Sequence, residues 1–519
     1  MTNTTNSSPR HSLPWALRNV LANWGGFVCS AIVSLFLSPF VVHRLGNSAY
    51  GVWVLIGSLT GYLGLLNLGV RAAVTRYVAQ FYAESKDEEA SGVASSALAI
   101  FLAAGIIAII ASVIMAFWVV PLFRVPRGFQ FAARIVLVLA GFNIAAALIG
   151  GVFGGVLAAI HRFDLLNIIE VAYSLLSTLT IVVILSAGKG LIALALVNFL
   201  FAFATGITNA WAVSRTYPAL SIRVSNRNLD HVRMIFSFSL YSFLLQLSFN
   251  LIFYSDSIVI GAFLSLNLIT YFAIAGNLVN YSRMLISGIS TTMTPRAGAL
   301  EATGRKREVQ SLLLKSTRLA TLVILPIALT FLLRGTSFIG LWMGPEYKEQ
   351  AGRVLWILSL ALIFAAEDQV ATSIMLGINK HRTVVLMIGV MALVNLSLSV
   401  VLGRRLGIAG VAWGTTFPSL GASLFFWPWY LQRSLNVRIV DFIISSWLRP
   451  ACAVFPFGVL TYWIEKLYPA AHLLTFFLQV GAILPTVLVA AWYLCLDRTD
   501  RGSYLQKLGL PIFGPLGSR

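Results

Sequence analysis

Four charged side chains lie inside or beside apolar stretches that are long enough to cross a membrane. Arg283 lies within residues 266–288, Glu367 and Asp368 interrupt residues 354–378, and Asp256 follows residues 234–255. Ionisable groups are costly in hydrocarbon and usually mark a site when they are retained there. An arginine at such a depth predicts an anion contact, and a carboxylate predicts a site for a coupling proton or Na⁺.

Each of these residues also has a structural interpretation. Arg283 could snorkel to the inner interface, and the Glu367–Asp368 pair could be hydrogen-bonded or paired with a base inside the protein. Successive helical residues point about 100° apart, so only one of the two carboxylates is expected to face a cavity. Asp256 could be an ordinary solvated helix end.

A second set of arginines flanks the apolar stretches. Arg71 and Arg76 follow residues 50–70, and Arg296 lies 220 residues after Arg76. They would form an anion funnel on the inner side, or they simply reflect the excess of cations in cytoplasmic loops. Arg44 is expected at the outer end of the first stretch, where that excess does not explain it, and it is a candidate for a second anion site.

The elements that position these residues are membrane helices. The chain has 519 residues, of which 58% are hydrophobic and 11% charged, whereas a soluble domain carries about 25% charged residues. Backbone polar groups must be satisfied within lipid, so the stretches are helices. We therefore expect an all-α, polytopic membrane protein. The fourteen predicted spans are residues 18–42, 50–70, 93–118, 135–159, 165–186, 190–212, 234–255, 266–288, 313–334, 354–378, 383–403, 408–431, 446–465 and 473–496.

The first twelve spans form an internal repeat. His161–Arg162 recurs 220 residues later as His381–Arg382, and the first six spans shifted by 220 residues fall on the next six. The sequence therefore predicts an N-terminal lobe at residues 1–215, a C-terminal lobe at residues 216–435, and two further helices with a tail at residues 436–519. An even number of spans per lobe gives a pseudo-two-fold axis along the membrane normal, which is typical of transporters that rock around a midplane site.

Lys and Arg residues predict the orientation. With both termini in the cytoplasm, 25 of the 37 cations lie in cytoplasmic segments and 11 on the other side, with Arg283 left out. This bias predicts a multi-pass protein with cytoplasmic termini. The formal net charge of +19 is then explained by loop cations, and we expect no nucleic-acid partner.

Several classes of chemistry are disfavoured. The three cysteines, Cys29, Cys452 and Cys495, lie in apolar stretches without zinc spacing, so no metal and no cofactor are expected. The predicted outer loops are too short for a catalytic domain, which argues against a membrane glycosyltransferase or polymerase. We expect no catalytic residue and no enzyme activity.

Residues 23–82 carry a family resemblance. The pieces are Pro39 before Arg44-Leu45-Gly46, then Tyr50-Gly51-Val52-Trp53, Leu68-Gly69 and Arg76-Tyr77-Val78, with Asp256-Ser257-Ile258-Val259-Ile260-Gly261 and Thr270-Tyr271-Phe272-Ala273-Ile274-Ala275 in the second half. This pattern resembles the bacterial polysaccharide and oligosaccharide flippases, the Wzx-like branch of the multidrug/oligosaccharidyl-lipid/polysaccharide exporter superfamily.

The resemblance implies a task. Such proteins move a lipid-linked oligosaccharide, usually on undecaprenyl pyrophosphate, to the outer leaflet of the bacterial inner membrane, for surface polysaccharides such as O-antigen or exopolysaccharide. Arg283 would then contact a phosphate or a sugar acid. Membrane lipids, a polysaccharide polymerase and chain-length machinery are the expected partners. A peptidoglycan-precursor flippase, an ion-coupled multidrug antiporter and a non-transport component of polysaccharide assembly remain the alternatives.

Amides in the spans would then bind sugar hydroxyls, or form hydrogen bonds between helices. Asn250, Asn277 and Asn280 are the first candidates, because the seventh and eighth spans are expected to border the cavity between the two lobes.

Overall fold

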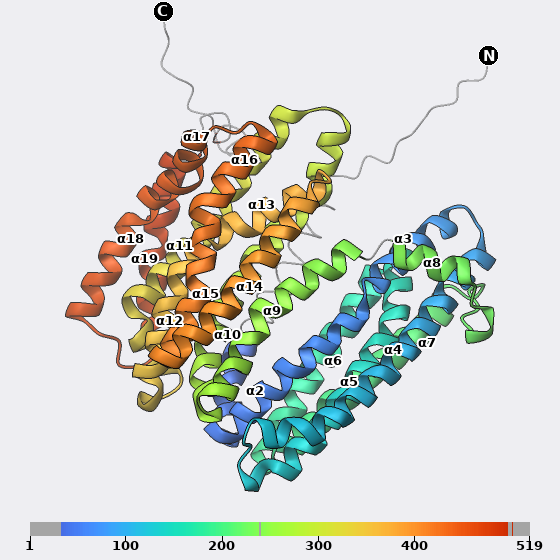
Figure 1. The fold of residues 1–519 in the computed structure, drawn as a ribbon. Coiled ribbons are helices and arrows are strands. Elements are labelled where there is room, and N and C mark those ends of the chain that lie inside the picture. Colours follow the sequence, from blue (N-terminus) through green and yellow to red (C-terminus); the bar gives the residue numbers. More distant parts are fainter. Residues whose placement is uncertain (1–32, 238–239, 497–500, 502–519) are drawn as a thin grey trace, which may run out of the picture.

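The computed structural model describes residues 33–237, 240–496 and 501, with the side chains of residues 236–242 left out. Within these residues the chain is helical and contains no strand. Cys29 and the beginning of the first predicted span lie outside them. Figure 1 shows two groups of long helices, one formed by the first part of the chain and one by the rest.

The first group begins with the apolar helix Val33–Leu45. It continues with α2 (Asn47–Gly61), η1 (Tyr62–Asn67), α3 (Val70–Ala83), α4 (Asp87–Leu122), α5 (Arg127–Ala159), α6 (Phe163–Ser186), α7 (Leu191–Thr216), η2 (Val224–Asn226) and α8 (Leu229–Ser237). Helix α5 packs against α4 and α7 and so lies at the centre of this group.

The second group comprises the remaining helices. They are α9 (Leu240–Phe263), α10 (Leu266–Ala302), α11 (Lys306–Trp342), η3 (Pro345–Tyr347), α12 (Lys348–Leu362), α13 (Ala365–Gly377), α14 (His381–Leu406), α15 (Ile408–Gly421), η4 (Ala422–Phe426), α16 (Trp427–Leu435), α17 (Ile439–Ile443), η5 (Ile444–Leu448), α18 (Arg449–Leu467) and α19 (Leu473–Leu494). Helices α18 and α19 pack on α11.

The predicted spans fall on helices wherever the structure describes them. Ten helices, or eleven if the bent pair α12–α13 is one span, are long and apolar enough to cross a membrane among the described residues. The predicted total of fourteen is therefore not confirmed. Helix α10 coincides with a predicted span but is absent from that set, because Asn277, Asn280 and Arg283 lower its mean hydropathy.

Two predicted spans contain a break. Between α12 and α13 the axis bends by 45° at Ile363–Phe364. Between η1 and α3 the backbone passes through left-handed conformations at Leu68 and Gly69, with φ values of 47° and 71°. A helix cannot continue through left-handed residues, so α3 begins as a new helix after Gly69. In the tenth predicted span, α12 ends at Leu362 and α13 begins at Ala365 without a left-handed residue between them.

The two groups meet where α2 crosses α10. A Cβ atom built on Gly51 would lie 2.1 Å from the carbonyl oxygen of Leu266, so only glycine permits this approach. Beside it, Thr270 Oγ1 donates to the Asn47 carbonyl at 2.8 Å, and Tyr347 Oη donates to Asn47 Oδ1 at 2.6 Å. From this contact the groups diverge toward the end that carries α3, α8 and α13 (Figure 1). The molecule is thus closed at the α2–α10 crossing.

Candidate functional site

A cavity of about 530 Å³ with several polar side chains in its wall lies between α9, α10 and α13. Helix α9 contributes Gln246 and Asn250, α10 contributes Asn280 and Arg283, and α13 contributes Asp368. Phe249, Phe253 and Met284 form apolar parts of the wall. Amide, guanidinium and carboxylate groups therefore converge in one space, which suits a ligand that carries both hydroxyls and charge.

A smaller cavity of about 90 Å³ continues from it into the second helix group. Asn280, Arg283 and Asp368 line both spaces, and Asp256 and Thr415 line only the smaller one. The structure thus gathers three of the four charged residues that the sequence singled out. Arg283 lies at the junction of the two cavities.

The Arg283 guanidinium is only partly satisfied. Its Nε atom is buried and has no hydrogen-bond partner. Gln369 lies beside it and donates to the Arg283 backbone carbonyl at 3.4 Å, while Asp368 supplies an opposite charge in the same cavity. Buried polar atoms are normally paired, so Arg283 keeps an unpaired donor while its side chain lines the cavity.

The break between α12 and α13 gives Glu367 and Asp368 a different environment from the predicted one. The sequence placed them near the middle of a continuous helix, whereas they lie in the first turn of α13. Free backbone N–H groups at a helix N-terminus favour negative charge. The helix break therefore reduces the cost of keeping two carboxylates at this depth.

A tryptophan indole binds each of the two carboxylates. Trp427 Nε1 donates to Asp368 Oδ1 at 3.0 Å, and Trp447 Nε1 donates to Glu367 Oε2 at 3.0 Å. Trp427 directly follows the π-helix η4 and Trp447 lies within the π-helix η5, and such segments often occur at functional sites. Asp368 faces the cavity, while Glu367 is 1% exposed and keeps a buried Oε1 without a partner.

Asp256 is buried in a hydrogen-bond network, which corrects the view of it as a solvated helix end. It lies within α9, before the end of that helix at Phe263, and it is 4% exposed. Ser399 Oγ donates to Asp256 Oδ1 at 3.0 Å, and Thr415 Oγ1 donates to Oδ2 at 2.6 Å. Asn395 in turn donates to Thr415 at 2.9 Å. Helices α14 and α15 thus supply polar partners for a carboxylate on α9.

The three candidate asparagines do not share one site. Asn250 lines the larger cavity, receives a bond from Gln246 at 2.9 Å and donates to the Gly61 carbonyl at 3.2 Å. Asn280 lines both cavities around Arg283. Asn277 donates to Tyr50 Oη at 3.3 Å and lines a separate cavity of about 220 Å³ between α10 and the first helix group.

The flanking arginines are dispersed. Arg71 Nη2 lies 3.5 Å from Glu170 Oε1 on α6. Arg76 is exposed and lies over the Tyr77 ring at 5.6 Å, and Arg44 is exposed over the Phe40 ring at 5.6 Å. Arg296 lines another pocket, with residues of α11 and the end of α19. None of these four lines the two cavities around Arg283.

Sequence reasoning missed the partners of the buried carboxylates. Trp427 lies 59 residues from Asp368, and Trp447 lies 80 residues from Glu367, so no local spacing links them. The one available signal was chemical, because a buried carboxylate needs donors and these indoles are donors within apolar spans.

Comparison with protein families identifies the chain. Residues 45–352 match the family described as "Polysaccharide biosynthesis protein". The membrane protein EpsK of Bacillus subtilis is 20% identical over 445 residues, covering 85% of this chain and 88% of EpsK. The probable flippase AglR of Haloferax volcanii is 22% identical over 399 residues, covering 76% and 78% of the two chains.

Solved structures share the fold. The lipid II flippase MurJ in an inward closed conformation has a TM-score of 0.72 at 15% identity and covers 94% of this chain and 99% of its own. An inward-facing MATE-family multidrug transporter of the MOP superfamily has a TM-score of 0.68 at 18% identity and covers 80% and 96%. The chain therefore belongs to the polysaccharide biosynthesis protein family, and it is a flippase-like, multi-pass membrane protein with the fold of the MOP superfamily.

Proposed function

We propose that the protein moves a lipid-linked oligosaccharide across the bacterial inner membrane by alternating access, as a step in surface polysaccharide synthesis. The substrate would carry its sugars on a prenyl pyrophosphate. The observation that carries this proposal is the cavity that Arg283 lines together with Asn280, Asn250 and Gln246. A guanidinium suits phosphate oxygens, and amides suit sugar hydroxyls.

The physical problem that such a protein solves is the crossing of a charged, hydroxylated headgroup. Transfer of these groups into hydrocarbon without hydrogen bonds is prohibitive, so a polar space must accompany the headgroup while the prenyl tail stays in lipid. The proposed moving parts are the predicted lobes, residues 1–215 and 216–435, with residues 436–519 added to the second. With cytoplasmic termini, the α2–α10 crossing would close the outer side.

Asp256, Asp368 and Glu367 are the proposed carriers of a coupling proton or Na⁺. In support, Asp256 and Glu367 are buried, Asp368 shares the cavity with Arg283, and each carboxylate accepts a hydrogen bond from a neutral donor. A neutral donor does not cancel the carboxylate charge, so binding of a cation can do so. The cavity around Arg283 would then be coupled to the ion through Asp368.

The test is complementation of a deletion strain, with lipid-linked glycan quantified in each leaflet by mass spectrometry. Wild-type protein should restore glycan to the outer leaflet, whereas Arg283→Glu at normal membrane abundance should trap it inside. A lost charge-assisted contact is worth about 1.5–3 kcal/mol, so Arg283→Gln should lower transport roughly ten- to a hundredfold.

Arg405→Glu is the matched control, because Arg405 is exposed at the end of α14 and lies outside the cavity. It should transport like the wild type. Transport that survives Arg283→Glu would show that this cavity does not hold the headgroup. Unchanged glycan in the deletion strain, together with altered dye sensitivity, would replace the proposal with multidrug efflux.

A further inference from the structure

A pocket on α10 faces the first helix group, on a different side of the helix from the two cavities around Arg283. This Asn277 pocket has a volume of about 220 Å³. Asn277 and Tyr281 of α10 line it together with Trp53 of α2 and Asn198 of α7. Its wall therefore combines residues from both helix groups.

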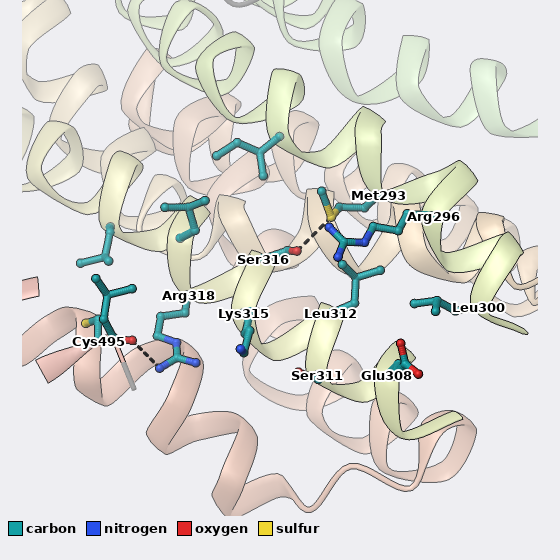
Figure 2. Close-up of a pocket in the computed structure, with 14 residues that line it drawn as sticks. Met293, Arg296, Leu300, Glu308, Ser311, Leu312, Lys315, Ser316, Arg318 and Cys495 are labelled. Carbon is teal, nitrogen blue, oxygen red and sulfur yellow. Dashed lines mark hydrogen bonds between the residues drawn. The ribbon is translucent and has the colours of Figure 1, made fainter. Parts of the chain in front are cut away.

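The Asn277 pocket has no charged side chain among the described residues that line it. Three aromatic rings, two asparagines and two serines provide its polar and aromatic surface. The pocket that Arg296 lines is different in kind, because the charged side chains of Arg296, Glu308 and Lys315 border it (Figure 2). A charged ligand in the Asn277 pocket would lose hydration without gaining a counter-charge, which is costly. The pocket therefore suits a neutral ligand.

Two polar side chains in the wall lack a partner in the described part of the protein. Asn198 and Trp53 are half-buried, and neither the Asn198 amide nor the Trp53 indole N–H forms a hydrogen bond with another described residue. Polar groups within membrane helices ordinarily bond to neighbouring helices. Leu194, one turn before Asn198, lines the same pocket, so this face of α7 is turned toward it. A hydroxylated ligand would supply the missing partners.

An open face of α2 runs from the Asn277 pocket toward the larger cavity. Trp53, Gly57 and Gly61 follow one another at four-residue steps, which places them on one face of the helix. Gly57 is exposed, and a Cβ atom built on it would meet no other atom within 4 Å. The carbonyl of Gly61 accepts a hydrogen bond from Asn250, which lines the larger cavity. Open space therefore adjoins α2 between the pocket and the cavity.

Helix α10 places the two spaces in the same order. Tyr281 lines the Asn277 pocket, and Met284, one turn further along, lines the larger cavity. Asn277 and Arg283 are six residues apart, or about 9 Å along the helix axis. A ligand of a few linked rings is long enough to reach from one space to the other.

We propose that the Asn277 pocket binds one neutral sugar ring of the lipid-linked oligosaccharide while the headgroup phosphate lies in the cavity around Arg283. This inference rests on the proposed function. The volume of about 220 Å³ corresponds to about seven water molecules at ~30 Å³ each, which is room for a single ring. Trp53 and Tyr281 would cover the C–H faces of the ring, and the amides of Asn198 and Asn277 would bind its hydroxyls.

Binding of three prenyl pyrophosphates to the full-length protein in detergent, measured by native mass spectrometry, tests the proposal. The first lipid carries no sugar, the second carries one glucose, and the third carries one glucuronic acid. Wild-type protein should bind the glucose lipid about tenfold more tightly than the bare lipid, the gain expected from one or two hydrogen bonds. Glucuronic acid should give no gain, because its carboxylate finds no counter-charge among the described residues of the pocket.

Asn198→Leu should remove the tenfold gain for glucose and leave binding of the bare lipid unchanged. The matched control is Asn143→Leu, because Asn143 on α5 is another half-buried amide of the first helix group and does not line the pocket. This control should keep the gain. Unchanged binding of the bare lipid shows that each variant is folded, so loss of the gain reports on the sugar alone.

The possible outcomes distinguish the sugar site from the proposed function. Failure of the wild type to bind any of the three lipids would refute both. Equal binding of the bare and glucose lipids would overturn the sugar site and leave the proposed headgroup site standing. The sugar site would also be overturned if Asn198→Leu kept the gain, or if glucuronic acid increased the affinity as much as glucose.

Discussion

Arg334 is a fully buried cation that joins α11 to the two C-terminal helices. Its side chain is 0% exposed; Nε donates to Glu465 Oε2 on α18 at 2.6 Å, and Nη2 donates to Gln479 Oε1 on α19 at 2.6 Å. The guanidinium also lies 4.5 Å from the centre of the Phe476 ring. Ser337, one turn along α11, donates to the other oxygen of Glu465.

Breaking this pair should be costly. Removal of one partner from a buried ion pair costs about 3–5 kcal/mol. Glu465 is 20% exposed and keeps its bond from Ser337, so we expect Arg334→Met to cost about 3 kcal/mol, at the lower end of that range. Glu465→Gln should cost a similar amount, because it leaves a buried guanidinium without a counter-charge.

The free energy of unfolding of the double variant shows whether Arg334 and Glu465 are energetically coupled or contribute independently. Arg334→Met/Glu465→Gln should cost about 3 kcal/mol instead of about 6, because the second change removes the penalty left by the first. The loosened helices should also alter the surroundings of Glu367, since its partner Trp447 lies in η5, which continues into α18.

The assay is unfolding in mixed micelles, followed by tryptophan fluorescence, with Arg353→Met as the control. Arg353 is exposed on α12, so its replacement should change the free energy of unfolding by less than about 0.5 kcal/mol. If the two single-variant costs add within about 0.5 kcal/mol, the pair is not energetically coupled and the reasoning fails.

Two further outcomes are expected. Gly51→Ala should force α2 away from α10, because its Cβ would lie 2.1 Å from the Leu266 carbonyl oxygen. Labelling of a cysteine introduced at the closed end should then increase, whereas Gly57→Ala, which has open space, should leave the labelling unchanged. Unchanged labelling in Gly51→Ala would contradict the closed crossing. Asp256→Asn should abolish the response of transport in proteoliposomes to an imposed proton or Na⁺ gradient. Asp441→Asn, at an exposed position, should respond like the wild type. A normal response in Asp256→Asn would show that Asp256 does not carry the coupling ion.

Hydropathy located the long apolar helices of this chain. Apolar runs of about 20 residues are a local signal, and the predicted spans fall on helices in the described residues apart from the breaks at Leu68–Gly69 and Ile363–Phe364. The depth of Arg283 and Asp368 along their helices was also readable, and both line the same cavity. The span at residues 266–288 was counted among the apolar stretches and agreed with the 220-residue repeat, although its polar residues exclude α10 from the set of clearly apolar helices.

Local signals could not reveal the break at Ile363–Phe364. Residues 360–366 are continuously apolar, and there is no proline or glycine between Leu358 and Gln369. Packing of α12 and α13 against α10 and α11 sets the bend, and the bend moves Glu367 and Asp368 from a helix middle to a helix N-terminus.

The sequence by itself determined which segments are helices and which charges lie within them. Only the tertiary structure decided the neighbours: Asp256 with Ser399 and Thr415, Arg334 with Glu465, and Arg296 in a pocket apart from Arg283. The reason is physical. Hydropathy depends on each segment alone, whereas a buried charge is stabilised by donors or counter-charges on helices that are remote along the chain.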